Sequence, residues 1–164
     1  MEKKEFYKQK TSPKEDLERL KKIEYPNLVS ETILDRFPLE GKKMLDSGSG
    51  PNTGLAEYVA GKGGMYVPLE LRTDTLSNMQ QALAAEQVPF YGVQGDVRNL
   101  PFADDTFDLV HQRFVFMNIL PETRAQSLRE LLRVGKRDFV FLEYDWGTLS
   151  SNEDPDRIER FRTL

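Results

Sequence analysis

The most constraining feature of this sequence is a short apolar segment that ends in an acid and runs directly into a glycine-rich turn. It covers residues 44–53, and residues 54–60 that follow have helical spacing. A buried strand that passes through a glycine turn into a helix N-terminus is the geometry of a nucleotide site in α/β proteins. Gly48 and Gly50 lack a Cβ, so the backbone can turn tightly there and approach a ligand closely. The segment therefore predicts a strand with a ligand site at its carboxyl end.

Two further carboxylates follow apolar runs downstream. Residues 65–69 lead into Glu70, and residues 90–95 lead into Asp96. If these runs are successive parallel strands, their carboxyl ends share the sheet edge at which open α/β sheets bind ligands. Each acid alone is explained as well by a helix cap or an ordinary turn. Three acids at the ends of three consecutive strands, however, indicate one common site.

The charge of Asp46 distinguishes between classes of ligand. A dinucleotide places its pyrophosphate against the glycine turn, where a neighbouring carboxylate would repel it. A ligand with an ammonium or sulfonium group would instead be attracted, and an acid at the end of the second strand can accept both hydroxyls of a ribose. Asp46 and Glu70 therefore favour a cationic nucleoside over NAD.

With these segments the chain resembles a class I S-adenosylmethionine-dependent methyltransferase of the small-molecule, type 11-like group. The resemblance covers about residues 40 to 146, and the matching segments occur in the family's order: residues 45–50, Glu70, residues 95–110 and residues 128–134. It implies a Rossmann-like doubly wound α/β fold with parallel strands in the order 3-2-1-4-5 and helices on both faces. It also implies methyl transfer from S-adenosylmethionine to oxygen, nitrogen or carbon of a small metabolite.

The resemblance assigns roles in cofactor binding residue by residue. Asp46 and the two glycines of the turn would hold the methionine end, Glu70 the ribose, and Asp96 with Val97 the adenine. Gln112 falls where the family's fourth strand ends under the methyl group. The full set of expected cofactor-binding residues lies at strand ends: Asp46, Gly48, Ser49, Gly50, Glu70, Leu71, Asp96, Val97 and Gln112.

The chain departs from the family pattern at three places. Asn52 replaces a third glycine, Pro68 replaces a glycine before the second acid, and residues 135–138 stand where the family has a Pro-Gly-Gly turn before the fifth strand. Pro68 removes a backbone donor and fixes φ beside the expected ribose site. None of these changes removes a charge that the cofactor needs.

Composition excludes several other classes of function. The chain of 164 residues fits one domain with a single core, and without cysteine and with His111 as the sole histidine no metal site is expected. A formal net charge of -4 with interspersed signs argues against a nucleic-acid partner. The charged N-terminus and the lack of a long apolar run predict a cytoplasmic protein without a membrane partner.

Periodicity and breakers give a coarse map of the chain. We expect residues 1–38 to form an N-terminal helical lid and residues 39–164 to form the S-adenosylmethionine-binding α/β domain. The expected strands are residues 44–46, 65–69, 90–95, 107–112 and 139–144, with helices beginning near residues 12, 27, 54, 73 and 121. Relatives add a helix and two antiparallel strands after the fifth strand, so we expect a shortened chain whose uncovered edge strand permits self-association.

The catalytic machinery is the part that the sequence defines least. Candidates for a general base are His111, Asp145 and Tyr7, with Glu143 and Tyr144 also near a strand end. A histidine in the middle of a strand is explained as well by a core role, and Tyr7 as well by an exposed terminus. Two alternatives to a methyltransferase remain at this point: a nicotinamide-dependent oxidoreductase, which Asp46 opposes, and a non-catalytic module that binds the adenosyl cofactor.

Overall fold

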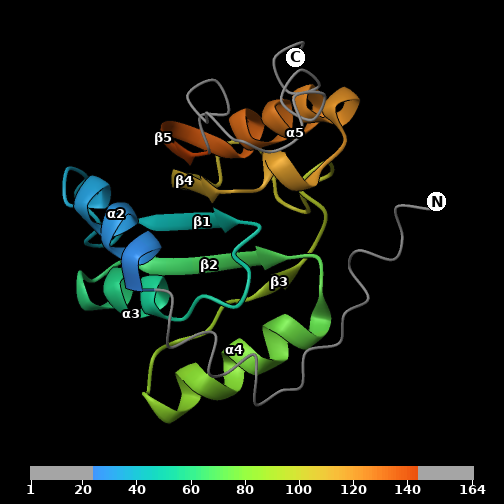
Figure 1. The fold of residues 1–164 in the computed structure, drawn as a ribbon. Coiled ribbons are helices and arrows are strands. Elements are labelled where there is room, and N and C mark those ends of the chain that lie inside the picture. The colour runs from blue at the N-terminus through green and yellow to red at the C-terminus, as the bar shows by residue number, and fades with distance from the viewer. Residues whose placement is uncertain (1–23, 144–164) are drawn as a thin grey trace, which may run out of the picture.

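A computed structural model describes the backbone of residues 24–143 and the side chains from residue 29 to residue 143. Within this part of the chain, a five-stranded sheet has the order β3-β2-β1-β4-β5, and each neighbouring pair is parallel. The predicted Rossmann-like fold class and strand order are therefore confirmed (Figure 1). In chain order the elements are α2 (Glu24–Leu34), β1 (Lys43–Ser47), α3 (Gly54–Gly61), β2 (Met65–Glu70), α4 (Thr73–Ala85), β3 (Val93–Gln94), β4 (Phe107–Arg113), the 3-10 helix η2 (Phe116–Asn118), α5 (Pro121–Val134) and β5 (Gly135–Leu142).

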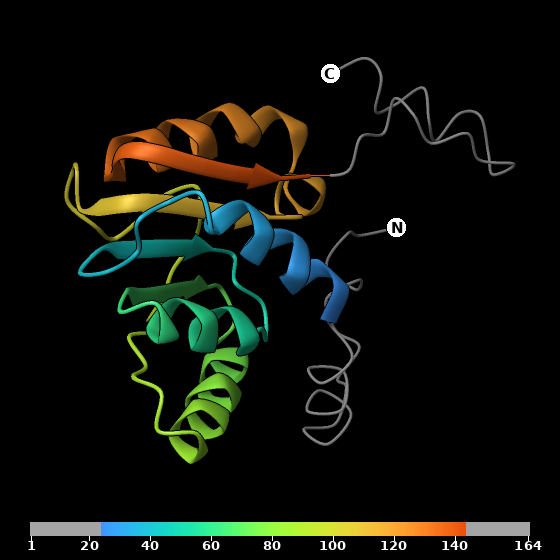
Figure 2. The same ribbon diagram turned by 90° about the vertical axis from the view of Figure 1, so that its left-hand side faces the viewer.

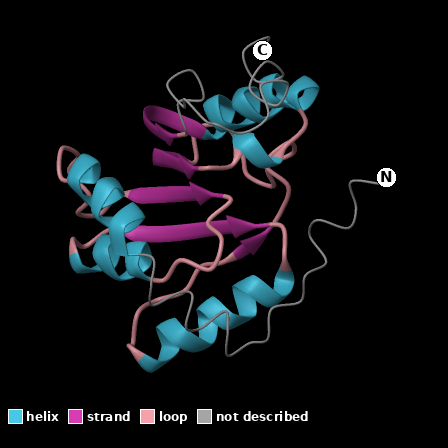
Figure 3. Ribbon diagram, in the orientation of Figure 1, coloured by secondary structure: helices cyan, strands magenta, loops and turns pink. Residues whose placement is uncertain are grey.

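The side chains of the sheet form two apolar clusters, one on each face. The first cluster joins β1 to helices α2, α3 and α4 through residues such as Leu34, Leu55 and Met79. The second joins β1 and β4 to α5 through residues such as Leu131 and Val134. Helices therefore cover both faces, as the alternation of strand and helix predicts (Figures 2 and 3).

Alternation along the central strands decides which face each side chain joins. Met44 belongs to the first cluster and Leu45 to the second, because successive side chains of a strand point to opposite faces. By the same alternation Asp46 lies on the face of α2 and α3, and Ser47 on the face of α5. This assignment places the polar residues at the end of β1 in two different environments.

Pro68 is accommodated inside β2, opposite Asp46 in register. β3 pairs with β2 only at Leu69 and Glu70, so Pro68 lies where β2 has a strand neighbour on one side alone. A residue without a backbone donor is tolerated at such a position. β2 therefore keeps its register to β1 despite the proline.

The interpretation of residues 135–138 as a turn is wrong, because β5 begins at Gly135, directly after α5. Gly135 has extended backbone angles (φ -93°, ψ 136°). A Cβ at this position would lie 2.5 Å from the Phe139 ring and 2.7 Å from a methyl carbon of Val110. The missing side chain thus lets the helix pass straight into the strand beneath these two residues.

Some expectations lie outside the described residues. These are the helix expected to begin near residue 12, Tyr7 at the N-terminal end, and Tyr144 and Asp145 after the fifth strand. In the described part, no helix combines the length and apolar character required to cross a bilayer.

Candidate functional site

The carboxyl ends of β1, β2 and β4 meet at one edge of the sheet. Ser47, the last residue of β1, is in register with Leu69 on β2 and with Gln112 on β4. The glycine turn leaves this edge from β1 and Glu70 leaves it from β2. The structure therefore brings the first two of the three predicted acids to the strand ends beside the predicted turn.

The glycine turn is attached to β2 by its backbone. The N–H groups of Gly48 and Ser49 donate to the carbonyl oxygen of Leu69, at 2.8 and 3.1 Å. Gly48 and Gly50 have positive φ angles of 69° and 57°, a region that disfavours residues with a Cβ. A Cβ on Gly48 would lie 2.5 Å from a methyl group of Val115, whereas one on Gly50 would meet nothing within 4 Å. Gly48 is thus needed for packing and conformation, and Gly50 presents an open side.

Glu70 links the second strand to the glycine turn. Its carboxylate accepts from the N–H of Gly50 at 3.0 Å and from the N–H of Arg72 at 3.1 Å. The side chain of the neighbouring Leu71 is exposed at this edge, and its role toward the cofactor stays a prediction. Glu70 is therefore joined to the glycine turn by a direct hydrogen bond.

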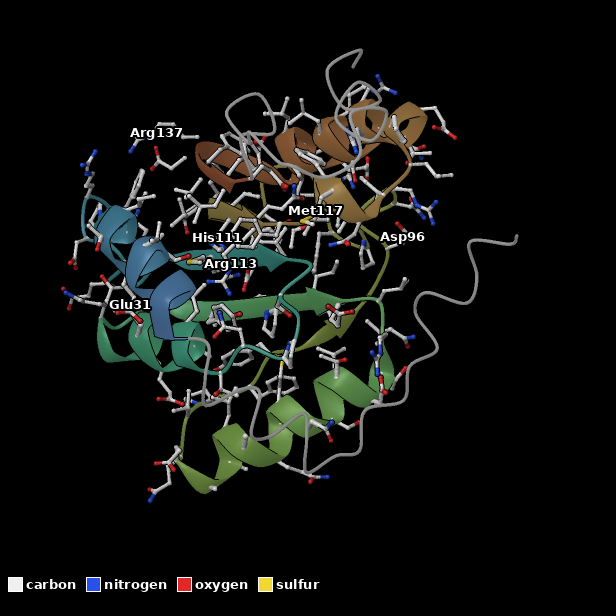
Figure 4. The ribbon with its side chains drawn as sticks, in the orientation of Figure 1. Glu31, Asp96, His111, Arg113, Met117 and Arg137 are labelled. Atoms are coloured by element: carbon white, nitrogen blue, oxygen red, sulfur yellow. The ribbon has the colours of Figure 1, made fainter. Side chains whose placement is uncertain are left out.

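Asp46 lies beneath the turn in a network of buried polar side chains. Its two carboxylate oxygens accept from the Tyr66 hydroxyl at 2.5 Å and bond to Nδ1 of His111 at 2.7 Å. The other ring nitrogen, Nε2, lies 3.2 Å from the Ser30 hydroxyl on α2. Arg113 also reaches this hydroxyl, at 3.5 Å, so His111 and Arg113 lie on the same side of β4 (Figure 4).

The network keeps Asp46 ionised although the side chain is buried. Burial alone would raise its pKa, but the His111 ring and the hydrogen bonds from His111 and Tyr66 outweigh burial and hold the pKa of Asp46 below its usual range. Burial and the adjacent Asp46 charge raise the pKa of the Tyr66 hydroxyl well above its ordinary value. The negative charge of Asp46 is therefore held under the glycine turn by hydrogen bonds from Tyr66 and His111.

Asp96 lies further along the edge, two residues beyond β3 (Figure 4). Its carboxylate accepts from the backbone N–H of Arg98 at 2.8 Å and is held by the Arg98 guanidinium. Hydrogen bonding from Arg98 keeps the pKa of Asp96 below its usual range, although partial burial opposes this. The adjacent Val97 is buried in the second apolar cluster. Val97 is thus a core residue in this structure, and its role toward an adenine stays a prediction.

Two polar side chains at the strand ends have no partner among the described residues. Neither amide atom of Gln112 has a hydrogen bond, and neither has the hydroxyl of Ser47, although both side chains are fully buried. Paired residues of neighbouring strands share a face, so the two lie side by side on the face of α5. A buried polar group without a partner costs about 1–3 kcal/mol and is rare in native structures. The two side chains are therefore unsatisfied within the described part of the chain, and a role of Gln112 toward the cofactor stays a prediction.

The candidate bases in the described part already have structural contacts. His111 is fully buried with both ring nitrogens engaged. One oxygen of Glu143 accepts from the backbone N–H groups of Val115 and Phe116, each at 3.0 Å. The other candidates, Tyr7, Tyr144 and Asp145, lie outside the described residues.

Sequence reasoning missed three residues of this region: Ser30, Ser47 and Tyr66. Ser47 carried a usable signal, because it stands between the acid of the first strand and the first glycine of the turn. Tyr66 carried a weaker one, since alternation in β2 places it on the same face as Met44 and Asp46. Ser30 has no local signal, because its contact depends on where α2 packs.

Comparison with known proteins gives a consistent family. A family model described as "Methyltransferase domain" matches residues 45–142. Demethylmenaquinone methyltransferase of Mycolicibacterium paratuberculosis is 38% identical over 94 residues, which make up 57% of this chain and 37% of that protein. The match thus spans little more than a third of this curated relative's length.

Solved structures show the same fold. A candidate S-adenosyl-L-methionine-dependent methyltransferase of Methanococcus maripaludis aligns with a TM-score of 0.70 at 21% identity, covering 95% of this chain and 84% of that one. A SAM-dependent methyltransferase of Aquifex aeolicus aligns with a TM-score of 0.62 at 19% identity, covering 90% and 80%. The family model covers more than half of the chain and extends from β1 to β5. The chain therefore belongs to the S-adenosylmethionine-dependent methyltransferase family.

Proposed function

We propose that this protein binds S-adenosylmethionine across the carboxyl ends of β1 and β2 and transfers its methyl group to oxygen, nitrogen or carbon of a small molecule. Membership of the family implies S-adenosylmethionine as the co-substrate. The cofactor supplies an electrophilic methyl group on a sulfonium. The residues of this chain supply binding and orientation.

The observation that carries the proposal is the hydrogen bond between the second acid and the glycine turn. Glu70 holds the N–H of Gly50, and the open side of Gly50 lies beside this contact. The hydroxyls of a ribose placed here can donate hydrogen bonds to the Glu70 carboxylate. The part of the cofactor next to the ribose can then approach Gly50 without meeting a side chain. An adenosyl compound thus fits the turn and the acid together.

The charge beneath the glycine turn supports the expected position of the amino-acid end of the cofactor. The methionine moiety carries an ammonium group, and Asp46 is the acid that precedes the turn. The buried charge of Asp46 under the turn favours the positively charged end.

Positioning, rather than a general base, is the mechanism that the described residues support. A donor and an acceptor held in line can account for much of the lowering of the barrier. His111 and Glu143 are engaged in structural hydrogen bonds, so we assign neither of them a proton-transfer role. An acceptor that ionises readily, or one that is already nucleophilic, suits such a site.

Titration calorimetry with S-adenosylhomocysteine tests the proposal directly. We expect binding to the wild type and none with NADH. Glu70→Ala should weaken binding by about 1–3 kcal/mol, the range for lost hydrogen bonds to a charged group. The matched control is Glu86→Ala, which changes an exposed glutamate at the end of α4. Equal affinity in the two variants would refute the assignment of Glu70.

A second experiment separates an enzyme from a non-catalytic binding module. Labelled S-adenosylmethionine is incubated with the protein and a small-molecule extract, with demethylmenaquinone as one defined acceptor because of the relative with that name. Transfer of label to any small molecule supports the enzyme. Binding of the cofactor with no transfer to any acceptor in the extract supports the module.

A further inference from the structure

A chain of four buried side chains connects helix α2 with the expected cofactor site. We call it the Ser30–His111–Asp46–Tyr66 network, and its links are the hydrogen bonds described above. Each of the four side chains belongs to a residue that is at most 3% exposed. The network lies on the sheet face that α2 and α3 cover, directly below the start of the glycine turn.

The hydrogen-bond roles of His111 follow from the chemistry of its partners. An ionised carboxylate can only accept, so the proton on Nδ1 is donated to Asp46. A neutral ring with this proton accepts at Nε2 from the Ser30 hydroxyl, and a protonated ring donates from Nε2 to the Ser30 oxygen, so the contact forms with either ring. One imidazole thereby joins a residue of α2 to the acid at the end of β1, which lies in register with it.

This arrangement fixes the direction of the Asp46 carboxylate. A buried charge is stable only when its oxygens are paired. Removal of the His111 donor would leave Tyr66 as the remaining partner in the network, and the carboxylate would gain from turning toward any other donor or toward water. Because Asp46 is two residues before Gly48, such a movement would alter the charge and the backbone at the turn itself.

We propose that His111 is a positioning residue for the methyl-donor site: Nδ1 holds the Asp46 carboxylate beneath the glycine turn, and Nε2 couples that carboxylate to the placement of α2. The inference rests on the proposed function, since the site that His111 positions is the one expected to bind S-adenosylmethionine. It differs from a catalytic role, because a fully buried ring with both nitrogens engaged does not reach an acceptor. It also makes the region that contains α2 a determinant of cofactor affinity.

Two substitutions of His111 separate the two ring nitrogens. The amide nitrogen of asparagine lies near the position of Nδ1, and that of glutamine lies near the position of Nε2. His111→Asn therefore retains a donor for Asp46, and His111→Gln retains only a partner on the Ser30 side. Both variants remove the imidazole from the same buried site. A purely structural role would lower their stability and their affinity in parallel.

The measurement is the Kd for S-adenosylhomocysteine together with the urea midpoint of each full-length variant. We expect His111→Gln to weaken binding roughly tenfold or more, and His111→Asn to stay within about threefold of the wild type. Equal loss in both variants, in proportion to their loss of stability, would overturn the positioning role. A wild type that binds no S-adenosylhomocysteine would overturn the proposed function as well, so the two failures are distinguishable.

The link to α2 has its own test, which also serves if a His111 variant does not fold. Ser30→Ala removes a single hydroxyl from the network. Its matched control is Ser77→Ala on α4, where the exposed hydroxyl bonds to the carbonyl oxygen of Thr73. We expect Ser30→Ala to weaken S-adenosylhomocysteine binding about threefold or more and Ser77→Ala to leave it unchanged. Equal affinity in both variants would overturn the coupling between α2 and the turn.

Discussion

At the scale of single residues, the two glycines of the turn are required for different reasons. Both have a positive φ, which costs a residue with a Cβ about 1–2 kcal/mol. Gly48 additionally faces Val115, which a new Cβ would approach to 2.5 Å, while Gly50 faces open space. The first glycine therefore contributes to packing, whereas the second leaves open space beside the turn, where we propose that the cofactor binds.

These differences predict different outcomes for two alanine variants. Gly48→Ala should lower the free energy of unfolding by more than about 2 kcal/mol, because overpacking adds to the backbone strain. Gly50→Ala should lower it by about 1–2 kcal/mol and should weaken S-adenosylhomocysteine binding, since its methyl group enters the open side of the turn. Urea unfolding and calorimetry report the two quantities separately. A Gly50→Ala variant with full affinity would contradict the placement of the ligand.

At the scale of elements, the ends of β4 and β5 are joined through the loop that follows β4. Phe114 has a positive φ of 56°, a strained conformation for an aromatic residue. Its N–H donates to the carbonyl oxygen of Leu142 at 2.8 Å, and the Asn118 amide donates to its carbonyl oxygen at 2.7 Å. Glu143 accepts from the next two N–H groups. Glu143 is therefore a cap for this loop in the structure.

Substitution of Glu143 tests this capping role. Glu143→Ala should lower the free energy of unfolding by about 1–3 kcal/mol, because two backbone donors lose a charged acceptor. Glu143→Gln should cost less, since its amide oxygen still accepts. Hydrogen exchange of the amides of Val115 and Phe116 provides the local measurement, with Glu86→Ala as the exposed control. Unchanged exchange at these two amides in Glu143→Ala would contradict the cap.

At the scale of the whole molecule, Asp46 connects the site to stability. Its network joins β1, β2, β4 and α2 within one apolar cluster. The pKa of Asp46 is below its usual range in the folded protein, and in the unfolded chain it is near 3.9. As the pH falls through this range the unfolded state binds the proton first, so the stability that Asp46 contributes is present above about pH 4 and is lost below it.

Acid unfolding of an Asp46 variant makes this measurable. Asp46→Asn should be less stable than the wild type at pH 7, because the substitution removes the carboxylate that accepts a charge-assisted hydrogen bond from His111. The difference should shrink as the pH falls below about 4, where the wild type also begins to lose the charge. Several exposed carboxylates titrate in the same range, so Glu86→Gln, which changes an exposed glutamate at the end of α4, is the control. If the difference in unfolding free energy between the wild type and Asp46→Asn stayed constant down to the acid transition, Asp46 would not carry a stabilising buried charge.

The sequence by itself determined the parallel sheet, the glycine turn and the strand-end positions of the acids. These follow from local patterns, since alternation and helical spacing specify which residues a strand or helix buries. The early start of β5 was not predicted, because a glycine in a sequence usually indicates a turn. In the structure Gly135 instead leaves room for the side chains of Phe139 and Val110.

Only the tertiary structure decided which polar atoms meet. The contacts of Asp46 with Tyr66 and His111 and the contact of His111 with Ser30 join residues 20, 65 and 81 positions apart. The same holds for Ser47 and Gln112, which strand register places side by side. Local periodicity specifies the face on which a side chain lies, but its neighbours on that face depend on strand register and on where helices pack. The sheet could therefore be predicted from the sequence, whereas the hydrogen-bond network beneath its ligand edge could not.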